Sequence, residues 1–248
     1  MKKLLPIIFI LIFCSCSSEP EVPSIYLQER GGVYYEVNST IPFTGKNRTK
    51  SEGFGITLIY VDTYKEGLRD GLQTIFRDGK LIEKTLYKDG LKDGLNEEFE
   101  KNGQLTSRRN YKDGQHHGLE EYFYGINGQL TSRRNYKDGQ KHGLEETYYE
   151  IGQLKSKVNY SDGNKDGLEE TYHENGYLKS KSQFLEGKMN GLSEGYDKNG
   201  KFSYKRNYKN DEFHGLIRWN KSLLNDEPVI GEVCHENGKK VDMSYCKK

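Results

Sequence analysis

Residues 160–183 read YSDGNKDGLEETYHENGYLKSKSQ, and variants of this segment recur through most of the chain. An aromatic residue opens each copy, with spacings of 23 to 25 residues, at Tyr64, Tyr87, Tyr111, Tyr136, Tyr160, Phe184 and Tyr208. The shared pattern is Tyr-Lys-Asp-Gly, three variable residues, Gly-Leu-x-Glu-x-aromatic, then Asn-Gly-x-Leu-x-Ser and three mostly polar or basic residues. Self-similarity at a fixed period of this length indicates a repeat architecture, in which each unit is one supersecondary motif that stacks on the next.

Each copy has the pattern of a β-hairpin. In the copy that opens at Tyr160, residues alternate with the period of a strand over 168–172 and again over 178–184. If the apolar residues of both strands share a face, Tyr172 pairs with Leu178 and a three-residue loop joins the strands. The last position of such a loop favours glycine with positive φ, and it is occupied by Gly103, Gly128, Gly152, Gly176 and Gly200. We therefore expect an all-β fold, an elongated single-layer solenoid of tandem antiparallel hairpins of about 24 residues each.

The same register assigns charged residues to faces. It places glutamates opposite serines of the next strand: Glu97 with Ser107, Glu121 with Ser132, Glu146 with Ser156 and Glu170 with Ser180. Stacked repeats would align these glutamates as an acidic row for a ligand or cation or, as we favour, as a hydrogen-bonded internal ladder. The register puts a basic row on the other face, made of Arg108, Arg133, Lys157, Lys181 and Lys205. This row is either a solvated face or a docking surface for an acidic partner.

The composition fits a thin β structure. A charged fraction of 30% and a mean hydropathy of -0.92 would by themselves favour disorder, but 19 Tyr and 28 Gly indicate buried aromatic surface and many turns. The net charge is only +1, so no overall field attracts nucleic acid. We expect no nucleic-acid partner.

The N-terminus has the pattern of a targeting segment. Two lysines precede an apolar run from Leu4 to Phe13, which is too short to span a bilayer and has the length of a signal-peptide core. The following Cys14-Ser15-Cys16 resembles the lipobox of bacterial lipoproteins, with Cys16 as the lipidated residue; the alternative is an ordinary secretory signal cut elsewhere. The expected location is the cell envelope, where the protein is lipid-anchored to a bacterial membrane and is either periplasmic or surface-exposed.

The flanks of the repeats should cap the sheet, because one hairpin cannot bury its own apolar face. The expected organisation is a signal peptide over 1–15, a lipidated cysteine and tether over 16–24, a degenerate N-terminal repeat or cap over 25–63, tandem repeats over 64–220, and a C-terminal hairpin cap over 221–248. An exported location permits a disulfide between Cys234 and Cys246. The expected loop Glu236-Asn237-Gly238, however, sets Cys234 opposite Lys240, so this bond would require the tail to fold back.

The Tyr-x-x-Gly-x-x-x-Gly-Leu units, followed by Asn-Gly-x-Leu, resemble the bacterial variant of the MORN repeat. The segment Pro42-Phe43-Thr44-Gly45-Lys46 is similar to the entry motif of such proteins, and the resemblance covers about residues 33 to 220. It implies an elongated, twisted hairpin solenoid that serves as an interaction module. Many bacterial members carry the label of YwqK-type antitoxins, which implies a possible role in immunity.

No spacing typical of a catalytic or cofactor motif is present, so we expect neither an enzyme nor a cofactor. Asp162, Asn164 and Asp166 match the first half of a calcium loop, but the twelfth position would be His173 in place of glutamate, so the repeat's own turn is the favoured interpretation. His116, His117, His142 and His214 are expected in solvated turns rather than in a metal site.

These observations favour a non-enzymatic, membrane-anchored repeat lipoprotein. Its expected role is that of an interaction scaffold or adhesin at the cell envelope, with an unidentified protein or glycan as partner and the membrane as the site of its lipid anchor. The alternative is an immunity protein that neutralises an envelope-acting toxin.

Overall fold

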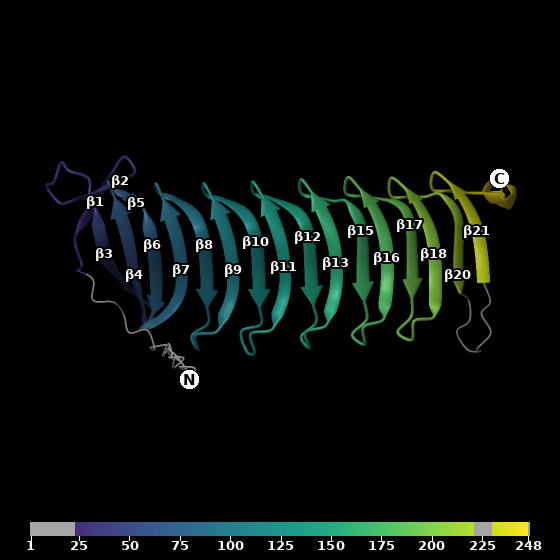
Figure 1. Ribbon diagram of the computed structural model, residues 1–248, viewed down its shortest axis with the longest axis horizontal. Coiled ribbons are helices and arrows are strands. Elements are labelled where there is room, and N and C mark those ends of the chain that lie inside the picture. The colour runs from purple at the N-terminus through teal and green to yellow at the C-terminus, as the bar shows by residue number, and fades with distance from the viewer. Residues whose placement is uncertain (1–22, 221–229, 248) are drawn as a thin grey trace, which may run out of the picture.

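The computed structural model describes residues 23–220 and 230–247, which form one long antiparallel sheet with a small hairpin at one end (Figure 1). The predicted signal peptide, Cys16 and the start of the predicted C-terminal cap lie outside the described residues. Within the described part, the single helix is the short 3-10 helix η1 (Met243–Lys247), and no helix is long and apolar enough to cross a membrane.

The strands follow one another in chain order. The small hairpin consists of β1 (Leu27–Arg30) and β2 (Val33–Glu36). The main sheet consists of β3 (Gly45–Gly53), β4 (Ile56–Lys65), β5 (Leu68–Arg69), β6 (Gly71–Arg77), β7 (Lys80–Lys88), β8 (Leu91–Phe99), β9 (Leu105–Lys112), β10 (Gln115–Phe123), β11 (Leu130–Lys137), β12 (Gln140–Tyr148), β13 (Leu154–Ser161), β14 (Asn164–Lys165), β15 (Gly167–Tyr172), β16 (Leu178–Leu185), β17 (Lys188–Tyr196), β18 (Phe202–Lys209), β19 (Glu212–Phe213), β20 (Gly215–Asn220), β21 (Ile230–Glu236) and β22 (Lys239–Val241). β5 and β6 both pair with β4, so they are two pieces of one strand, as are β14 with β15 and β19 with β20. The first strand of the main sheet, β3, and its last strand, β22, lie at opposite ends of the sheet (Figure 1). This arrangement confirms the predicted all-β, single-layer repeat architecture.

The upper edge of the sheet in Figure 1 consists of tight turns. Two residues with left-handed conformation join the strands there, as at Asp113 and Gly114, whose φ values are 48° and 80°. Residues Lys112 and Gln115 pair on either side of that turn. This is the geometry of a type I′ turn, for which Asp-Gly is a favoured sequence because both residues tolerate positive φ. The Tyr-Lys-Asp-Gly motif therefore ends one hairpin and begins the next.

Between β8 and β18 the lower edge of the sheet consists of longer loops, whereas β3 with β4 and β6 with β7 are joined there by two-residue turns. Residues 174–176 connect His173 to Tyr177, and the main-chain nitrogen of His173 donates to the carbonyl oxygen of Tyr177 at 2.9 Å. Gly176 ends the loop with a φ of 85°. Both the three-residue loop and the predicted pairing of Tyr172 with Leu178 are confirmed.

A β-bulge beside each loop shows that the predicted register of the remaining pairs is wrong by one residue. Thr171 pairs with Ser180 while Tyr172 pairs with Leu178, so Lys179 is an extra residue on the second strand. The shift recurs beside Phe76, Phe99, Phe123, Tyr148 and Tyr196.

The bulge changes which side chains share a face, because side chains alternate along a strand. Glu170 lies opposite Lys181, whereas the sequence predicted Ser180. Phe184 lies opposite Gly167 and therefore on the face that Leu168 does not occupy. The prediction that the opening aromatic and the leucine of Gly-Leu share a face is wrong for the same reason.

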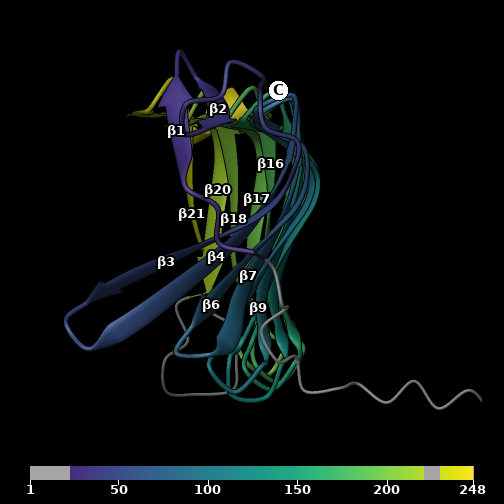
Figure 2. The same cartoon turned by 90° about the vertical axis from the view of Figure 1, so that its left-hand side faces the viewer.

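The strands bow, so the sheet has a concave and a convex face (Figure 2). The β1–β2 hairpin lies on the concave side, where the rings of Tyr34 and Tyr64 are 5.2 Å apart. The opening aromatics therefore line the concave face, and the leucines of Gly-Leu line the convex face. Polar residues in the middle of the concave face are buried by the bow: Thr85 and Asn96 are 0% and 1% exposed.

The N-terminal end is capped by chain segments that precede the repeats. β1 and β2 pair only with each other among the strands, so this part of the predicted degenerate repeat lies outside the main sheet. The main-chain nitrogen of Tyr34 donates to the carbonyl oxygen of Gly67, and Phe43 packs against the edge of the Tyr64 ring. The first hairpin of the main sheet, β3–β4, contributes Ile59 and Val61 to a small apolar core with Phe76.

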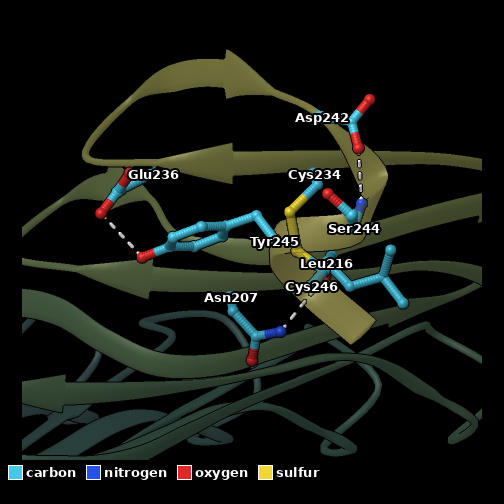
Figure 3. The surroundings of a disulfide bond; sticks show 8 residues. All are labelled: Asn207, Leu216, Cys234, Glu236, Asp242, Ser244, Tyr245 and Cys246. Atoms are coloured by element: carbon cyan, nitrogen blue, oxygen red, sulfur yellow. Dashed lines mark hydrogen bonds between the residues drawn. A yellow bond between two sulfur atoms is a disulfide. The ribbon is translucent and has the colours of Figure 1, made fainter. Parts of the chain in front are cut away.

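The C-terminal end is capped by a disulfide between Cys234 and Cys246, whose Cα atoms are 6.0 Å apart (Figure 3). The predicted register is again wrong by one residue, since Asn237-Gly238 is a two-residue turn and Cys234 pairs with Val241. The turn brings η1 back over the sheet, so Cys246 reaches Cys234, which is fully buried. Cys234 pairs with Leu216 and continues the row of leucines, so the disulfide covers the end of that row.

Removing this bond should destabilise the C-terminal end. The two cysteines are 12 residues apart, and cross-linking a segment of this length stabilises a fold by about 2–3 kcal/mol. Trp219, the single tryptophan of the chain, lies in the adjacent β20 and reports on this region through its fluorescence. We expect Cys246→Ala to lower the urea midpoint of the Trp219 signal, and a reductant to lower the wild-type midpoint equally without affecting the variant. A wild-type midpoint that is insensitive to reductant would contradict the disulfide.

Candidate interaction surfaces

The convex face presents a row of leucines from the Gly-Leu motifs. Four of them are 37–44% exposed although they lie in the interior of the sheet: Leu72, Leu119, Leu144 and Leu168. Leu86, which pairs with Leu72 but precedes Tyr87 instead of following a glycine, is 40% exposed. Asparagine side chains on neighbouring strands hold the backbone of this row, as Asn110 Nδ2 does by donating to the carbonyl oxygen of Leu119 at 2.7 Å. The leucine row is thus rigidly positioned and incompletely covered.

A ladder of alternating charge runs beside the leucine row. Cross-strand pairs link its members without a break from β8 to β18, in the order Glu97, Arg108, Glu121, Arg133, Glu146, Lys157, Glu170, Lys181, Glu194 and Lys205. The basic residues therefore line one face, as predicted, but they share it with the glutamates that were predicted for the other face. Charges of both signs alternate in equal number over these ten residues, and the cross-strand pairs continue to Lys84 at one end and to Arg218 and Glu232 at the other.

Short ion pairs hold the charge ladder together. Lys157 Nζ lies 2.5 Å from a carboxylate oxygen of Glu170, and Glu194 lies between Lys181 and Lys205, at 2.7 and 3.1 Å. The hydrogen bond from Lys181, together with Lys205, holds the pKa of Glu194 below its ordinary value. The hydroxyl of Tyr172 donates to Glu170 at 3.1 Å, and that of Tyr196 donates to Glu194 at 3.3 Å. The fold therefore does not present a purely basic surface on which an acidic partner could dock, because glutamates alternate with the basic residues.

The concave face carries a different row at the tight-turn edge. The opening aromatics alternate with the residues five positions later, which are Arg69, Lys92, His116, Lys141, Lys165, Met189 and Phe213. The cations lie over the next aromatic ring, as Lys141 does at 4.7 Å from the centroid of Tyr160 and Lys165 at 4.9 Å from that of Phe184. Because neighbouring side chains occupy the ring faces, this row serves to stack one repeat on the next.

The middle of the concave face buries charge. Glu120 is 3% exposed and lies 3.3 Å from Arg109 Nε and 3.5 Å from Arg134 Nε. The hydroxyl of Tyr122 donates to the same carboxylate at 3.1 Å. A buried carboxylate persists only when it is paired and hydrogen-bonded, so this cluster is part of the interior of the repeats.

A cavity of about 640 Å³ lies at the N-terminal end of the concave face, between the segment 24–27 and the first hairpin. Tyr34, Tyr60 and Tyr64 line it, with Asp62 at its base. Asp62 is 4% exposed and accepts hydrogen bonds from Arg69 Nε at 2.9 Å and from the amide of Gln73. Burial, with the charge of Asp62, raises the pKa of Tyr64 to about 12. The polar groups at the base thus bind one another.

The calcium candidates lie apart from any metal-binding cluster. Asp162 is the first residue of the tight turn Asp162-Gly163 and Asn164 follows that turn, while Asp166 lies between β14 and β15, where its main-chain nitrogen donates to the carbonyl oxygen of Asn159. Over residues 23–220 and 230–247, no group of three or more His, Cys, Asp and Glu side chains is arranged to hold a metal ion.

Three of the four histidines differ from their predicted placement in turns, whereas His214 lies outside the strands, between β19 and β20. His116 and His117 lie within β10 and His142 lies within β12, because the tight turn uses only two residues and the strand begins directly after it. His116 packs edge-on between the rings of Tyr111 and Tyr136, at centroid distances of 4.6 and 5.1 Å. His116 therefore occupies the same position in the concave row as Lys92 and Lys141 do in the neighbouring repeats.

Three features of the surface were not predicted from the sequence: the exposed leucine row, the alternating charge ladder and the residue five positions after each opening aromatic. The sequence contains a signal for the last of these, since Arg, Lys, His, Lys and Lys occupy it in five successive copies. The ladder could not be derived because it depends on the bulge.

Four segments match the family model of the MORN repeat variant, at residues 92–113, 141–162, 165–186 and 189–210. Each segment spans one hairpin, from just after one tight turn to the next. The chain thus contains MORN-type repeats, and repeats of this kind are commonly involved in protein or membrane binding. Comparison with curated proteins finds no match.

Acid should lower the free energy of unfolding by protonating glutamates of the charge ladder, and the variant Glu194→Gln tests this effect. The pKa of Glu194 is lowered in the folded state, so its contribution to stability is complete above its ordinary value of 4.5 and is lost as the pH falls through the folded value. Glu194→Gln should cost at most about 1 kcal/mol at pH 7 and should reduce the loss of stability between pH 5 and about pH 3. Urea unfolding at a series of pH values measures both effects. Glu174→Gln, in a loop, is the control and should follow the wild-type curve; an identical acid response of Glu194→Gln would contradict the ladder.

Proposed function

We propose that this MORN-repeat chain is a non-enzymatic lipoprotein of the bacterial cell envelope whose convex face binds a protein or glycan partner. It acts as an interaction scaffold or adhesin. A single-layer sheet presents side chains as parallel rows, whereas a catalytic site needs groups that converge from several directions on one reacting atom.

The observation that carries the proposal is the exposed leucine row. The leucines recur on alternate strands with an asparagine or glutamine paired between them, and a surface that repeats in this way along an extended sheet is what repeat proteins use for binding. The leucines lie in the interior of a regular sheet, so solvent exposure there is a repeated property of the fold and not an irregularity of one loop. Leu72 and Leu168, which lie four repeats apart, are 44% and 41% exposed.

The charge ladder makes this face suitable for burial by a partner. Each member of the charge ladder between β8 and β18 already has an oppositely charged cross-strand neighbour, so covering the ladder leaves none of its charges isolated. The ladder also orders the long side chains before binding, which lowers the entropic cost of association. A partner would thus gain apolar contact with Leu119, Leu144 and Leu168 at low electrostatic cost.

The envelope location is supported by the C-terminal disulfide and by the lipobox-like sequence. Disulfides persist in oxidising compartments outside the cytoplasm, and the Cys234–Cys246 disulfide lies at the C-terminal end of the leucine row. Cys16 is the proposed site of lipidation, which attaches the N-terminal end of the rod to the membrane.

The proposal is tested by in-cell cross-linking with three variants. We expect wild-type protein to fractionate with membranes and to be captured by its partner, and Cys16→Ala to be released from membranes. Leu119→Ser combined with Leu144→Ser and Leu168→Ser should remain in membranes and lose capture at least tenfold, since each leucine buries roughly 1–2 kcal/mol of apolar contact. The control combines Leu91→Ser with Leu185→Ser, which removes leucines that are 51% and 52% exposed at tight turns, outside the row.

Each outcome separates the candidate roles. Equal capture by the triple variant and the control would contradict binding through the leucine row, and wild-type protein free in the cytoplasm would contradict the lipoprotein. A captured toxin that acts in the envelope would favour the alternative role of an immunity protein, while capture of a surface component of another cell would favour an adhesin.

A further inference from the structure

The tip of the β3–β4 hairpin differs from the other tight turns of the protein. Phe54 and Gly55 form its two-residue turn, with φ values of 51° and 74°, between the paired residues Gly53 and Ile56. Every other non-glycine residue with positive φ in the described chain is Asn, Asp or Glu: Asn38, Glu66, Asp78, Asp89, Asp113, Asp138, Asp162, Glu186, Asn210, Asp211 and Asn237. Phe54 is the exception, and a bulky aromatic residue is strained in this conformation.

The strain at Phe54 brings no compensating contact within the fold. Its side chain is fully exposed to solvent, and Ile56 beside it is 41% exposed. The hairpin splays away from the rest of the sheet (Figure 2), so the tip projects from the rod. Phe54 thus has two unfavourable features, a strained backbone and an exposed apolar side chain. A residue of this kind is expected at a site that contacts another molecule or a membrane.

The charge of the hairpin indicates what that contact is. β3 carries three basic residues and one acidic residue, so its net charge is positive although Lys50 Nζ lies 2.5 Å from a carboxylate oxygen of Glu52. The side chains of Lys46 and Lys50 are exposed. Basic residues along a strand that ends in an exposed aromatic tip match an anionic bilayer surface, where aromatic side chains enter the interface and lysines remain at the headgroups.

The position of the hairpin relative to the N-terminus adds a geometric argument. The carbonyl oxygen of Pro23 accepts a hydrogen bond from the main-chain nitrogen of Arg48, so the chain leaves the fold at β3. Seven residue steps separate Cys16 from Pro23, a reach of at most about 25 Å. Six residue steps along the hairpin separate Arg48 from Phe54, a distance of about 20 Å. A bilayer that holds Cys16 is therefore within reach of Phe54.

We propose that the β3–β4 tip is a second membrane contact, in which Phe54 and Ile56 enter the interface of an anionic bilayer while Lys46 and Lys50 face the headgroups. The geometric argument rests on the proposed lipid anchor, whereas the chemistry of the tip does not. Two attachment points, the acyl chains and the hairpin, fix the direction of the rod relative to the membrane and hold its convex face open to a partner.

The experiment uses the chain from residue 17 onward, which lacks the anchor and keeps every residue of the described fold. Binding to vesicles of phosphatidylcholine with phosphatidylglycerol, and of phosphatidylcholine alone, is measured by co-sedimentation. We expect binding to the anionic vesicles, a loss of at least about tenfold in partitioning for Phe54→Asn, and an unchanged or higher urea midpoint for that variant because Asn relieves the strain. The matched control is Ile126→Asn, which removes an equally exposed apolar residue from a loop of the repeats and should partition as the wild type does.

Fluorescence locates the tip directly. Phe54→Trp should shift its emission to shorter wavelength on anionic vesicles and be quenched by brominated lipid, whereas Ile126→Trp should show neither effect. The proposal is overturned if the wild type ignores both vesicle types, if Phe54→Asn binds as well as the wild type, or if the tryptophan at position 54 is not quenched. Loss of protein capture in cells by Phe54→Asn without vesicle binding would also overturn it and would assign the tip to a protein pocket. Because the assay contains neither acyl chain nor partner, its failure is distinct from a failure of the anchor or of the leucine row.

Discussion

The extra residue beside each hairpin loop determines which chemistry each face of the sheet presents. Side chains alternate along a strand, so one unpaired residue transfers all residues beyond it to the opposite face. Lys179 is such a residue, and because of it Glu170 faces Lys181 while Phe184 turns to the concave side. The charge ladder, the leucine row and the concave aromatic row all follow from this bulge and from its equivalents in the other repeats.

Stability in this architecture comes from contacts between neighbouring repeats. On the concave face the cation of one repeat packs against the aromatic ring of the next, as Lys165 does against Phe184, and Glu120 is enclosed by two arginines. Such nearest-neighbour terms add along the rod, and the end repeats need separate caps. The β1–β2 hairpin over Tyr64 and the disulfide at Cys234 provide them. In the described part of the chain the convex face has no covering layer over its leucines, which is why they are partly exposed.

Much of the fold could be predicted from the sequence because repetition makes local rules visible. The period, the three-residue loop ending in Gly176 and the pairing of Tyr172 with Leu178 all follow from hydrophobic alternation and turn chemistry. The bulge could not be derived, since Leu178, Ser180, Ser182 and Phe184 keep an unbroken alternation across the extra residue.

Because every copy has the same pattern, comparison between copies cannot distinguish the bulged register from the unbulged one. The placement of the basic row opposite the glutamates followed from it, and so did the wrong partners for the serines. The conformation of Phe54 could not be predicted for another reason, since the repeat pattern does not extend to its hairpin. Only the structure shows that Phe54 has the positive φ that Asn, Asp or Glu has in the other turns.

A double-mutant cycle between Glu97 and its two possible partners on β9 tests the register most directly. We predict a coupling free energy of about 0.5–1 kcal/mol between Glu97→Gln and Arg108→Gln, because these residues pair across β8 and β9 and Arg108 lies 3.1 Å from a carboxylate oxygen of Glu97. We expect almost none between Glu97→Gln and Ser107→Ala, since Ser107 pairs with Glu98 on the opposite face and donates to the carboxylate of Glu98. Strong coupling of Glu97 to Ser107, with none to Arg108, would restore the unbulged register and contradict the assignment of both faces.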